Sequence, residues 1–237
     1  GLSQKEYVVQ EFLESYNENK KIGCDIYGVW SNHYLEYFKK YCKITNSLDI
    51  SYSGLLRPIN NFNKMTSFKK ISKRKIRVLL ISEPLTSALE ITPYLQSLLK
   101  HDDIDVAIKV RPMIKDIYYE EMKVAFPQIR NLKLYDGKIE EEGKEFDVFI
   151  GSMSTAIIEG SLFGKISVLL NTLKFGDYYD IDSLIPGRSL LVRDPELLYE
   201  HIVDRVNNEH SLNTIEIIRK RFFGENKDGA QWLVEQL

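Results

Sequence analysis

The sequence predicts an α/β protein whose main part is an open, doubly wound parallel sheet of the Rossmann-like kind, preceded by a smaller α/β section. Short apolar runs alternate with helical patterns along most of the chain, which is the order of elements in such a sheet. The runs are apolar at consecutive positions, as in "VFI" at 148–150, so helices are expected to cover both faces of each strand. With 43% apolar residues among 237, the chain can build a sizeable core.

The amino-terminal section contains only a few elements. A helix is predicted over 6–19, a strand over 25–30 and a helix over 32–41, followed by the alternating strand "LDISYSG", which ends at Gly54. These elements are too few for a doubly wound sheet of their own. We therefore interpret residues 1–62 as the closing part of an amino-terminal α/β domain.

A basic stretch, "KMTSFKKISKRK" at 64–75, follows this section. We predict that residues 63–75 form a solvated linker between the two parts of the chain. The alternative is a cationic patch that contacts anionic lipid head groups or a phosphorylated ligand.

The main domain is predicted over 76–237. Its strands are expected at 77–81, 106–110, 132–135, 148–150, 166–170 and 189–194. Its helices are expected at 88–100, 115–125, 155–163, 195–206, 212–222 and 230–237. Pro195 stands in the first turn of its helix, where a missing N–H is tolerated, and Gly164 ends the helix at 155–163. Each strand, helix and next strand then make a right-handed crossover.

Composition excludes several classes of protein. The net charge of −2, from 32 basic and 34 acidic side chains, gives no reason to expect nucleic-acid binding. Cys24 and Cys42 show neither CxxC pairing nor metal spacing, so no disulfide framework, metal site or resident cofactor is expected. No signal-peptide pattern and no apolar run of about twenty residues occur, so we expect a cytoplasmic protein, at most at the inner face of the membrane. Because Gly1 replaces a start methionine, we expect either a piece of a longer chain or a tag remnant.

Candidate site residues follow three of the predicted strands. Ligands bind open parallel sheets at the carboxyl ends of the strands, and those ends here read "SEPL" at 82–85, "KVRPM" at 109–113 and "GSMST" at 151–155. The third segment also begins a helix, where free N–H groups and the helix dipole attract anions. The inventory of one carboxylate, two cations and three hydroxyl groups fits a phosphorylated polar ligand. The residues that supply it are Glu83, Lys109, Arg111, Ser152, Ser154 and Thr155.

Glu159 lies four residues after Thr155 and hence on the same face of the predicted helix. An acid at this position is either an ordinary surface residue or an acceptor for hydroxyl groups of the ligand. The polar segment "YYDIDSL" at 178–184 is equally open, either as a cover over the ligand or as a surface loop. The four histidines, His33, His101, His201 and His210, show no triad or metal spacing and are predicted to be structural or exposed.

Taken together, these motifs resemble the carboxyl-terminal half of glycosyltransferases with the two-domain GT-B architecture, particularly bacterial enzymes of surface and capsular polysaccharide synthesis. The resemblance covers about residue 75 to the end. It implies that this half binds a nucleotide sugar, with Ser154 and Thr155 at the phosphate and Glu159 at a sugar hydroxyl. "KVRPM" resembles a lysine, proline, histidine, proline motif of this architecture, with Arg111 where histidine is usual. A guanidinium can grip phosphate with two parallel hydrogen bonds.

The resemblance also bears on the two ends of the chain. The final segment, "DGAQWLVEQL", resembles a helix that crosses back onto the first domain. Residues 1–62 then belong to an acceptor-type domain, but domains usually exceed about a hundred residues. The chain is therefore either the donor-binding part of a longer enzyme or a reduced relative. Glu83 is the candidate catalytic residue, with capping of the next turn as the alternative.

The leading functional hypothesis is metal-independent transfer of a sugar from a nucleotide sugar to a surface-glycan or lipid-linked acceptor. No pair of acids of the DxD type ends a predicted strand, and "DYYDID" lies in a predicted loop. The two alternatives are a nucleotide-sugar 2-epimerase, which would use a similar turn and glutamate, and a non-catalytic module that binds nucleotide sugars.

Overall fold

A computed structural model describes residues 25–41, 49–55, 74–83, 86–110, 115–152, 154–173, 177, 180, 182, 189–208, 216–224 and 228–237. The helix predicted at 6–19, most of the predicted linker and Arg111 lie outside the described residues.

The main sheet is parallel throughout and has six strands in the order β5-β4-β3-β6-β7-β8. In chain order the strands are β3 (Ile76–Ile81), β4 (Ile104–Lys109), β5 (Lys133–Tyr135), β6 (Val148–Gly151), β7 (Ile166–Leu170) and β8 (Leu191–Val192). Numbered along the sheet's own chain order, this is the arrangement 3-2-1-4-5-6 of the classic dinucleotide-binding fold. The predicted Rossmann-like, doubly wound parallel sheet is confirmed.

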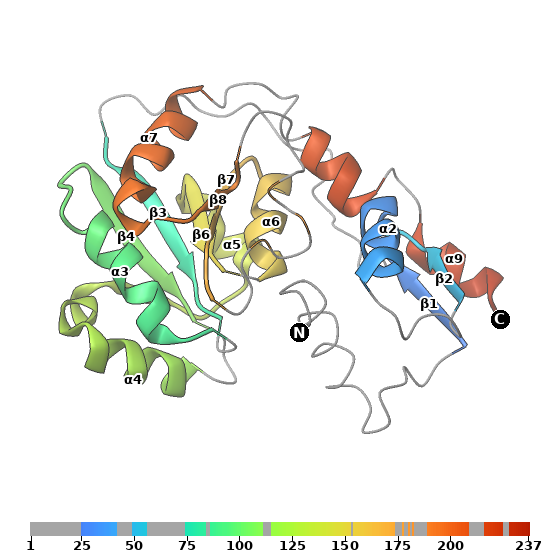
Figure 1. Ribbon diagram of the computed structural model, residues 1–237, viewed down its shortest axis with the longest axis horizontal. Coiled ribbons are helices and arrows are strands. Elements are labelled where there is room, and N and C mark those ends of the chain that lie inside the picture. Colours follow the sequence, from blue (N-terminus) through green and yellow to red (C-terminus); the bar gives the residue numbers. More distant parts are fainter. Residues whose placement is uncertain are drawn as a thin grey trace.

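Helices cover both faces of this sheet, and each face has its own core (Figure 1). On one side lie α3 (Ala88–Leu98), α4 (Lys115–Ala125) and α7 (Leu198–Asn208); on the other lie α5 (Ile139–Glu142) and α6 (Thr155–Leu162). Alternate residues of a strand point to opposite faces. Accordingly Val78 belongs to the core under α3, whereas Leu79 belongs to the core on the α6 side.

Among the described residues, 3-10 turns that join these elements include η3 (Pro127–Asn131), η4 (Gly143–Glu145) and η6 (Pro195–Leu197). The helix predicted at 195–206 therefore starts as a 3-10 turn and continues as α7 to Asn208. Its start is capped by Asp194, whose carboxylate accepts a hydrogen bond from the Glu196 N–H at 3.0 Å.

The amino-terminal section forms a smaller unit, as predicted. Its strands β1 (Ile26–Val29) and β2 (Asp49–Tyr52) are parallel neighbours, joined through α2 (Asn32–Tyr41) and the residues that follow it. The end of the chain returns to this unit through the π-helical turn η7 (Arg219–Phe223) and α9 (Gly229–Glu235), which lies beside β1 and β2 (Figure 1).

Close contacts fix this return of the chain. The rings of Phe222 and Tyr34 have centroids 4.7 Å apart, and Leu55 forms an isolated parallel bridge with Asp228. Gly28 is required where it stands, because a Cβ there would lie 2.8 Å from the Trp232 ring. The final helix therefore packs against the first section, as the resemblance implies. The boundaries 1–62, 63–75 and 76–237 stay predictions.

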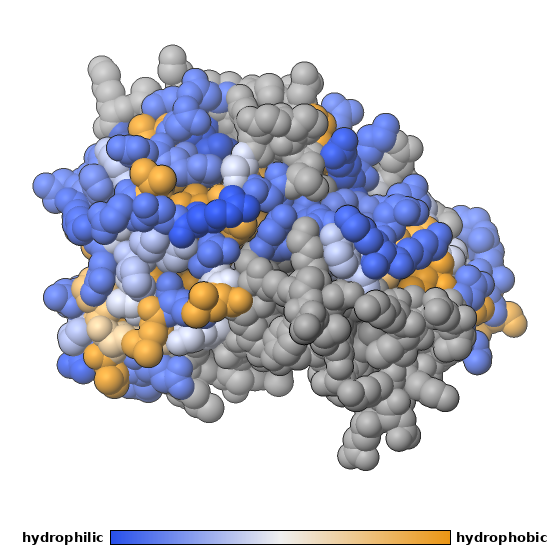
Figure 2. Space-filling model, viewed as in Figure 1, coloured by the Kyte–Doolittle hydropathy of each residue, from blue (hydrophilic) through white to orange (hydrophobic). Residues whose placement is uncertain are grey.

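On the face of the molecule that Figure 2 shows, the described residues are mainly polar. Some large apolar side chains are exposed, for example Val124 and Leu173, which is normal for a folded protein. Among the described residues, no helix is both long enough and apolar enough to cross a membrane.

Candidate functional site

The order of strands predicts a ligand crevice between β3 and β6. The chain leaves these neighbouring strands in opposite directions, and in open α/β sheets the ligand binds just beyond the carboxyl ends at that point. Here the two ends are the segments that begin at Ser82 and at Ser152. Both serine side chains are buried.

Two of the three segments predicted from the sequence meet at this crevice. The Ser152 hydroxyl donates to the Thr86 hydroxyl at 3.4 Å, and the Thr86 hydroxyl donates to the Glu83 carbonyl at 2.8 Å. All three side chains are buried, with Glu83 only 2% exposed. Glu83 is thus held at the end of β3, and its main-chain carbonyl is linked through Thr86 to Ser152, in the turn that leads from β6 into α6.

The next helix is not capped by Glu83. Ser87 occupies the N-cap of α3, and its hydroxyl accepts a hydrogen bond from the Leu89 N–H at 3.2 Å. The turn after β3 is closed by the main chain, because the Thr86 N–H also donates to the Glu83 carbonyl, at 3.1 Å. Glu83 therefore closes this turn through its carbonyl group, and a role of its carboxylate at a ligand stays a prediction.

The turn from β6 into α6 brings a helix amino terminus to the crevice. Ser154 has the extended N-cap conformation, with φ −70° and ψ 130°, yet its side chain makes no capping hydrogen bond. The first N–H groups of a helix lack partners within the helix and carry partial positive charge. The side chain of Ser154 therefore does not occupy these groups, although the Ile157 N–H donates to the Ser154 carbonyl at 3.0 Å. That an anion binds at this helix terminus stays a prediction.

A glycine is needed just before this turn. Gly151 has φ 159°, and a Cβ there would lie 2.8 Å from the carbonyl oxygen of Ile81 on β3. It would also lie 2.7 Å from Cδ1 of Ile157. The backbones at the ends of β3 and β6 can approach each other only because position 151 has no side chain.

Small residues set the height of α6 above the sheet. A Cβ at Gly160 would stand well inside contact distance of the Phe149 ring, which is fully buried. On β7, the Ser167 hydroxyl donates to the Ile157 carbonyl at 2.6 Å. These contacts hold α6 close on the sheet, and they fix where its first turn points.

Thr155 and Glu159 are both half-buried on α6, one turn apart. This spacing puts them on one face of the helix. Whether that face meets a phosphate at Thr155 and a sugar at Glu159 stays a prediction.

Lys109 is directed into the protein. It ends β4 opposite Ile81 and Tyr135, and it is 8% exposed. Its Nζ donates to the Val110 carbonyl at 3.1 Å and lies 4.0 Å from the Glu142 carboxylate on α5. Burial lowers the pKa of Lys109, and the charge of Glu142 partly offsets this effect. Its ammonium group therefore balances Glu142, and its proposed role at a phosphate is untested.

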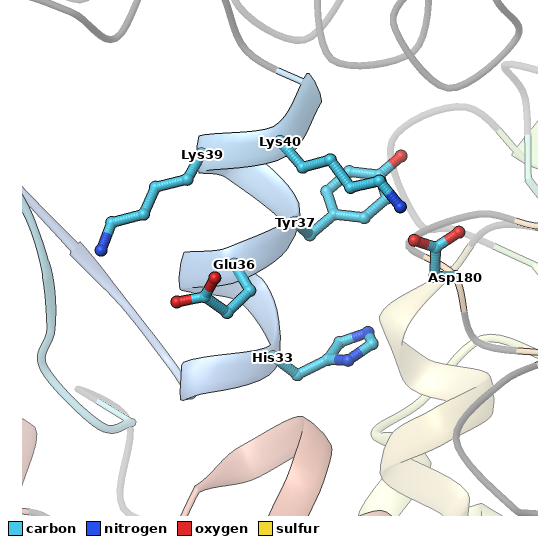
Figure 3. Close-up of a pocket in the computed structure, with 6 residues that line it drawn as sticks. All are labelled: His33, Glu36, Tyr37, Lys39, Lys40 and Asp180. Atoms are coloured by element: carbon cyan, nitrogen blue, oxygen red, sulfur yellow. The ribbon is translucent and has the colours of Figure 1, made fainter.

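A cavity lies outside the predicted site, between α2 and Asp180 (Figure 3). It has a volume of about 510 Å³. The described residues that line it are His33, Glu36, Tyr37, Lys39, Lys40 and Asp180. The sequence analysis missed this cavity, although four of these residues recur at spacings of three and four along α2. In the described part of the chain, no group of three or more His, Cys, Asp and Glu side chains is placed to hold a metal.

No known family and no curated protein matches this sequence, but many solved structures match its fold. One is a point mutant of TarM of S. aureus in complex with fondaparinux, alpha-GlcNAc-glycerol and UDP, at 16% identity and a TM-score of 0.57. Sucrose-phosphate synthase of Thermosynechococcus elongatus matches at 12% identity and 0.58, and Anabaena HepE with UDP-glucose at 12% and 0.57.

The fold is the Rossmann-like α/β fold of GT-B structures. The matches cover 94%, 98% and 95% of this chain, and 45%, 61% and 68% of TarM, the synthase and HepE respectively. This chain therefore spans roughly half to two thirds of the length of these proteins. At such low identities the matches show the fold and leave the activity to be argued from the site.

Proposed function

We propose that this chain binds a nucleotide sugar in the crevice between β3 and β6, as the donor-binding part of a GT-B glycosyltransferase. The sugar passes to a surface-glycan or lipid-linked acceptor without a metal ion. The observation that carries this proposal is the amino terminus of α6, which Ser154 leaves without a side-chain cap at the crevice. Support comes from TarM, which is solved with UDP, and from HepE, which is solved with UDP-glucose.

The chemistry that such a site supplies is stabilisation of the leaving group. When the bond between sugar and phosphate breaks, negative charge develops on the departing nucleoside diphosphate. The N–H groups at the start of α6, with the hydroxyls of Ser154 and Thr155, hold that charge without reorganising, which is the kind of stabilisation that lowers a barrier most. Arg111 adds a bidentate grip on the same phosphates.

Two carboxylates have separate roles in this proposal. Glu159, one turn further along α6, accepts hydrogen bonds from sugar hydroxyls, where it is displaced from the phosphate that would repel it. Glu83, buried at the end of β3, is the candidate catalytic carboxylate at the reacting sugar or acceptor hydroxyl. Lys109 stays a candidate for the phosphate from the end of β4, although its ammonium group lies 4.0 Å from the Glu142 carboxylate.

The experiment is a thermal-shift panel of nucleoside mono- and diphosphates, followed by incubation with the matching nucleotide sugars. A nucleotide at a hundred times its dissociation constant should stabilise the fold by about 2.7 kcal/mol. For a chain of this size that corresponds to a rise in Tm of roughly 5 to 10 °C. No shift with any nucleotide would refute the proposal.

The incubation separates the alternatives. Hydrolysis or transfer of the sugar supports the glycosyltransferase. Exchange of the hydrogen at sugar carbon 2 with solvent would instead support an epimerase, and nucleotide binding without turnover would support a binding module.

A further inference from the structure

Asn171 follows directly after β7, and hydrogen bonds fix its backbone. Its N–H donates to the Val192 carbonyl at 3.0 Å, and two residues earlier the Leu169 N–H donates to the Leu190 carbonyl at 2.7 Å. The carbonyl of Asn171 accepts from the Tyr94 hydroxyl at 3.1 Å. The ladder between β7 and β8 therefore continues to Asn171, and both main-chain groups of this residue take part in hydrogen bonds.

The position of Asn171 in β7 directs its side chain to the face of the sheet that α6 covers. Alternate residues of a strand point to the same face. The Ser167 hydroxyl donates to the Ile157 carbonyl of α6 at 2.6 Å, and Leu169 lies in the same buried cluster as Ile157. Leu170 belongs to the cluster on the opposite face. Asn171 comes next in the series of Ser167 and Leu169, so its side chain lies on the α6 side.

Asn171 also stands further out than the start of α6. This helix joins two parallel strands, so it runs back from the carboxyl edge of the sheet to the amino edge. Ser167 is level with Ile157, because the two are hydrogen-bonded. From that level β7 rises about 13 Å to Asn171, whereas α6 rises only about 4.5 Å back to Ser154. Asn171 therefore lies roughly 8 Å beyond Ser154, in front of the first N–H groups of the helix.

The amide group of Asn171 is accessible and does not hold the fold together. The residue is half-buried, and its side chain makes no hydrogen bond to any residue that the structure describes. The next residues turn to the other face: Thr172 is buried, and the Leu173 N–H donates to the carboxylate of Glu90 on α3 at 2.7 Å. The end of β7 thus presents an amide group toward the start of α6 on a fixed backbone.

We propose that Asn171 is a further substrate-binding residue, whose amide group hydrogen-bonds hydroxyl groups of the transferred sugar. The proposal rests on the proposed function, which holds a phosphate of the nucleotide sugar at the start of α6. A phosphate oxygen lies about 3 Å from the N–H groups that bind it, so a side chain further out meets the group bonded to that phosphate. An amide has a donor half and an acceptor half. Sugar hydroxyls use both halves, whereas an ionised phosphate offers acceptors only.

The test compares nucleotides with their sugar conjugates by calorimetric titration of the whole chain. The nucleotides are UDP, GDP, ADP and CMP, and the conjugates are UDP-glucose, UDP-N-acetylglucosamine, GDP-mannose, ADP-glucose and CMP-N-acetylneuraminate. The proteins are the wild type, Asn171→Ala, Asn171→Leu and the control Asn207→Ala, which makes the same change at an exposed position of α7. Circular dichroism and Tm check the fold, which should stay intact because Asn171 is held through its main chain.

Asn171→Ala should bind the conjugate that the wild type prefers at least about fivefold more weakly, because hydrogen bonds to the sugar are lost. Asn171→Leu keeps the volume of the side chain but removes both halves of the amide, so it should show a loss of the same size. Both variants should bind the parent nucleotide within about twofold of the wild type, and Asn207→Ala should match the wild type for both ligands.

Two results would overturn this inference and leave the proposed donor site standing. Equal losses for conjugate and parent nucleotide would put Asn171 at the phosphate, and unchanged affinity for both would remove Asn171 from the site. A wild type that binds none of these nucleotides or conjugates would instead refute the donor site, and the inference about Asn171 would fall with it.

Discussion

Ser154→Asp should strengthen the start of α6 and at the same time expel the nucleotide. Ser154 already has the N-cap conformation but makes no side-chain cap. The same chain shows what an aspartate does there: Asp228 caps α9, accepting hydrogen bonds from the Ala230 and Gln231 N–H groups at 2.9 and 3.2 Å. An aspartate at position 154 should therefore occupy the N–H groups that we assign to phosphate. Such a cap contributes about 1 kcal/mol to stability.

The loss of binding can be estimated from charge. A carboxylate about 4 Å from a phosphate oxygen repels it by about 4 kcal/mol at an effective dielectric constant of about 20. Allowing half of this for screening and relaxation leaves a loss of at least about 2 kcal/mol, or roughly thirtyfold in dissociation constant. The matched control is Ser154→Asn, which caps the helix without charge and should cost only about 1 kcal/mol through competition.

Calorimetric titration with the nucleotide that gives the largest thermal shift measures the affinities, and Tm without ligand measures the fold. We expect affinity to fall in the order Ser, Asn, Asp while the Tm of both variants stays level or rises. If a variant keeps or gains Tm but loses affinity for the nucleotide, the weaker binding cannot come from unfolding and must come from a change at the site. If Ser154→Asp binds the nucleotide as tightly as wild type, the phosphate does not lie at this helix.

Three further outcomes are expected. Glu159→Gln should weaken nucleotide-sugar binding by about 1 to 3 kcal/mol but leave pyrophosphate binding unchanged, as calorimetry with both ligands can check, because only the sugar has hydroxyls for the carboxylate. Gly160→Ala should lower the free energy of unfolding in urea by about 1 to 3 kcal/mol, although alanine has the better helix propensity, because the added Cβ meets Phe149. Adding Phe149→Leu to the same protein should restore part of this loss. Burial, reinforced by Arg205, lowers the pKa of His201 to about 4, below its ordinary value of about 6.5. The unfolded chain therefore binds a proton first, and stability should fall by up to about 2 kcal/mol as pH drops from about 6.5 to about 4; His201→Gln should abolish that slope in unfolding measured against pH.

The elements that the sequence predicts best are those whose apolar pattern decides their packing. The predicted ranges of α2, α4 and β7 agree with the structure at both ends, because each has clear apolar spacing between distinct boundaries. The predicted ranges agree less well with the structure at the edge of the sheet and near the end of the chain. The strand predicted at 189–194 has only two residues in β8, which lies at the edge of the sheet and pairs on one side only. The helix predicted at 212–222 ends as the π-helical turn η7, which apolar spacing does not reveal.

The sequence predicts one of the two candidate sites but not the other. The crevice at the ends of β3 and β6 follows from the rule for open parallel sheets, so Glu83 and Ser152 could be placed there from chain order alone. The cavity on α2 combines that helix with Asp180, which lies more than a hundred residues later in the chain. No local pattern specifies such a pairing. The signal available was the recurrence of His33, Glu36, Tyr37 and Lys40 on one helix.

Both sites depend on α6, but in different ways. Gly160 and Ser167 fix the height of α6 on the sheet, and its residues Ile157 and Ile158 share a buried cluster with Tyr37 of α2. A substitution that lifts the helix is therefore expected to disturb the proposed nucleotide crevice and the cavity on α2 together, and a loss of activity would not say which site failed. Ser154 lies at the tip of the same helix and outside that cluster, so a change of its charge acts on the crevice alone. Position 154 is for this reason the one at which nucleotide binding can be separated from the packing that supports it.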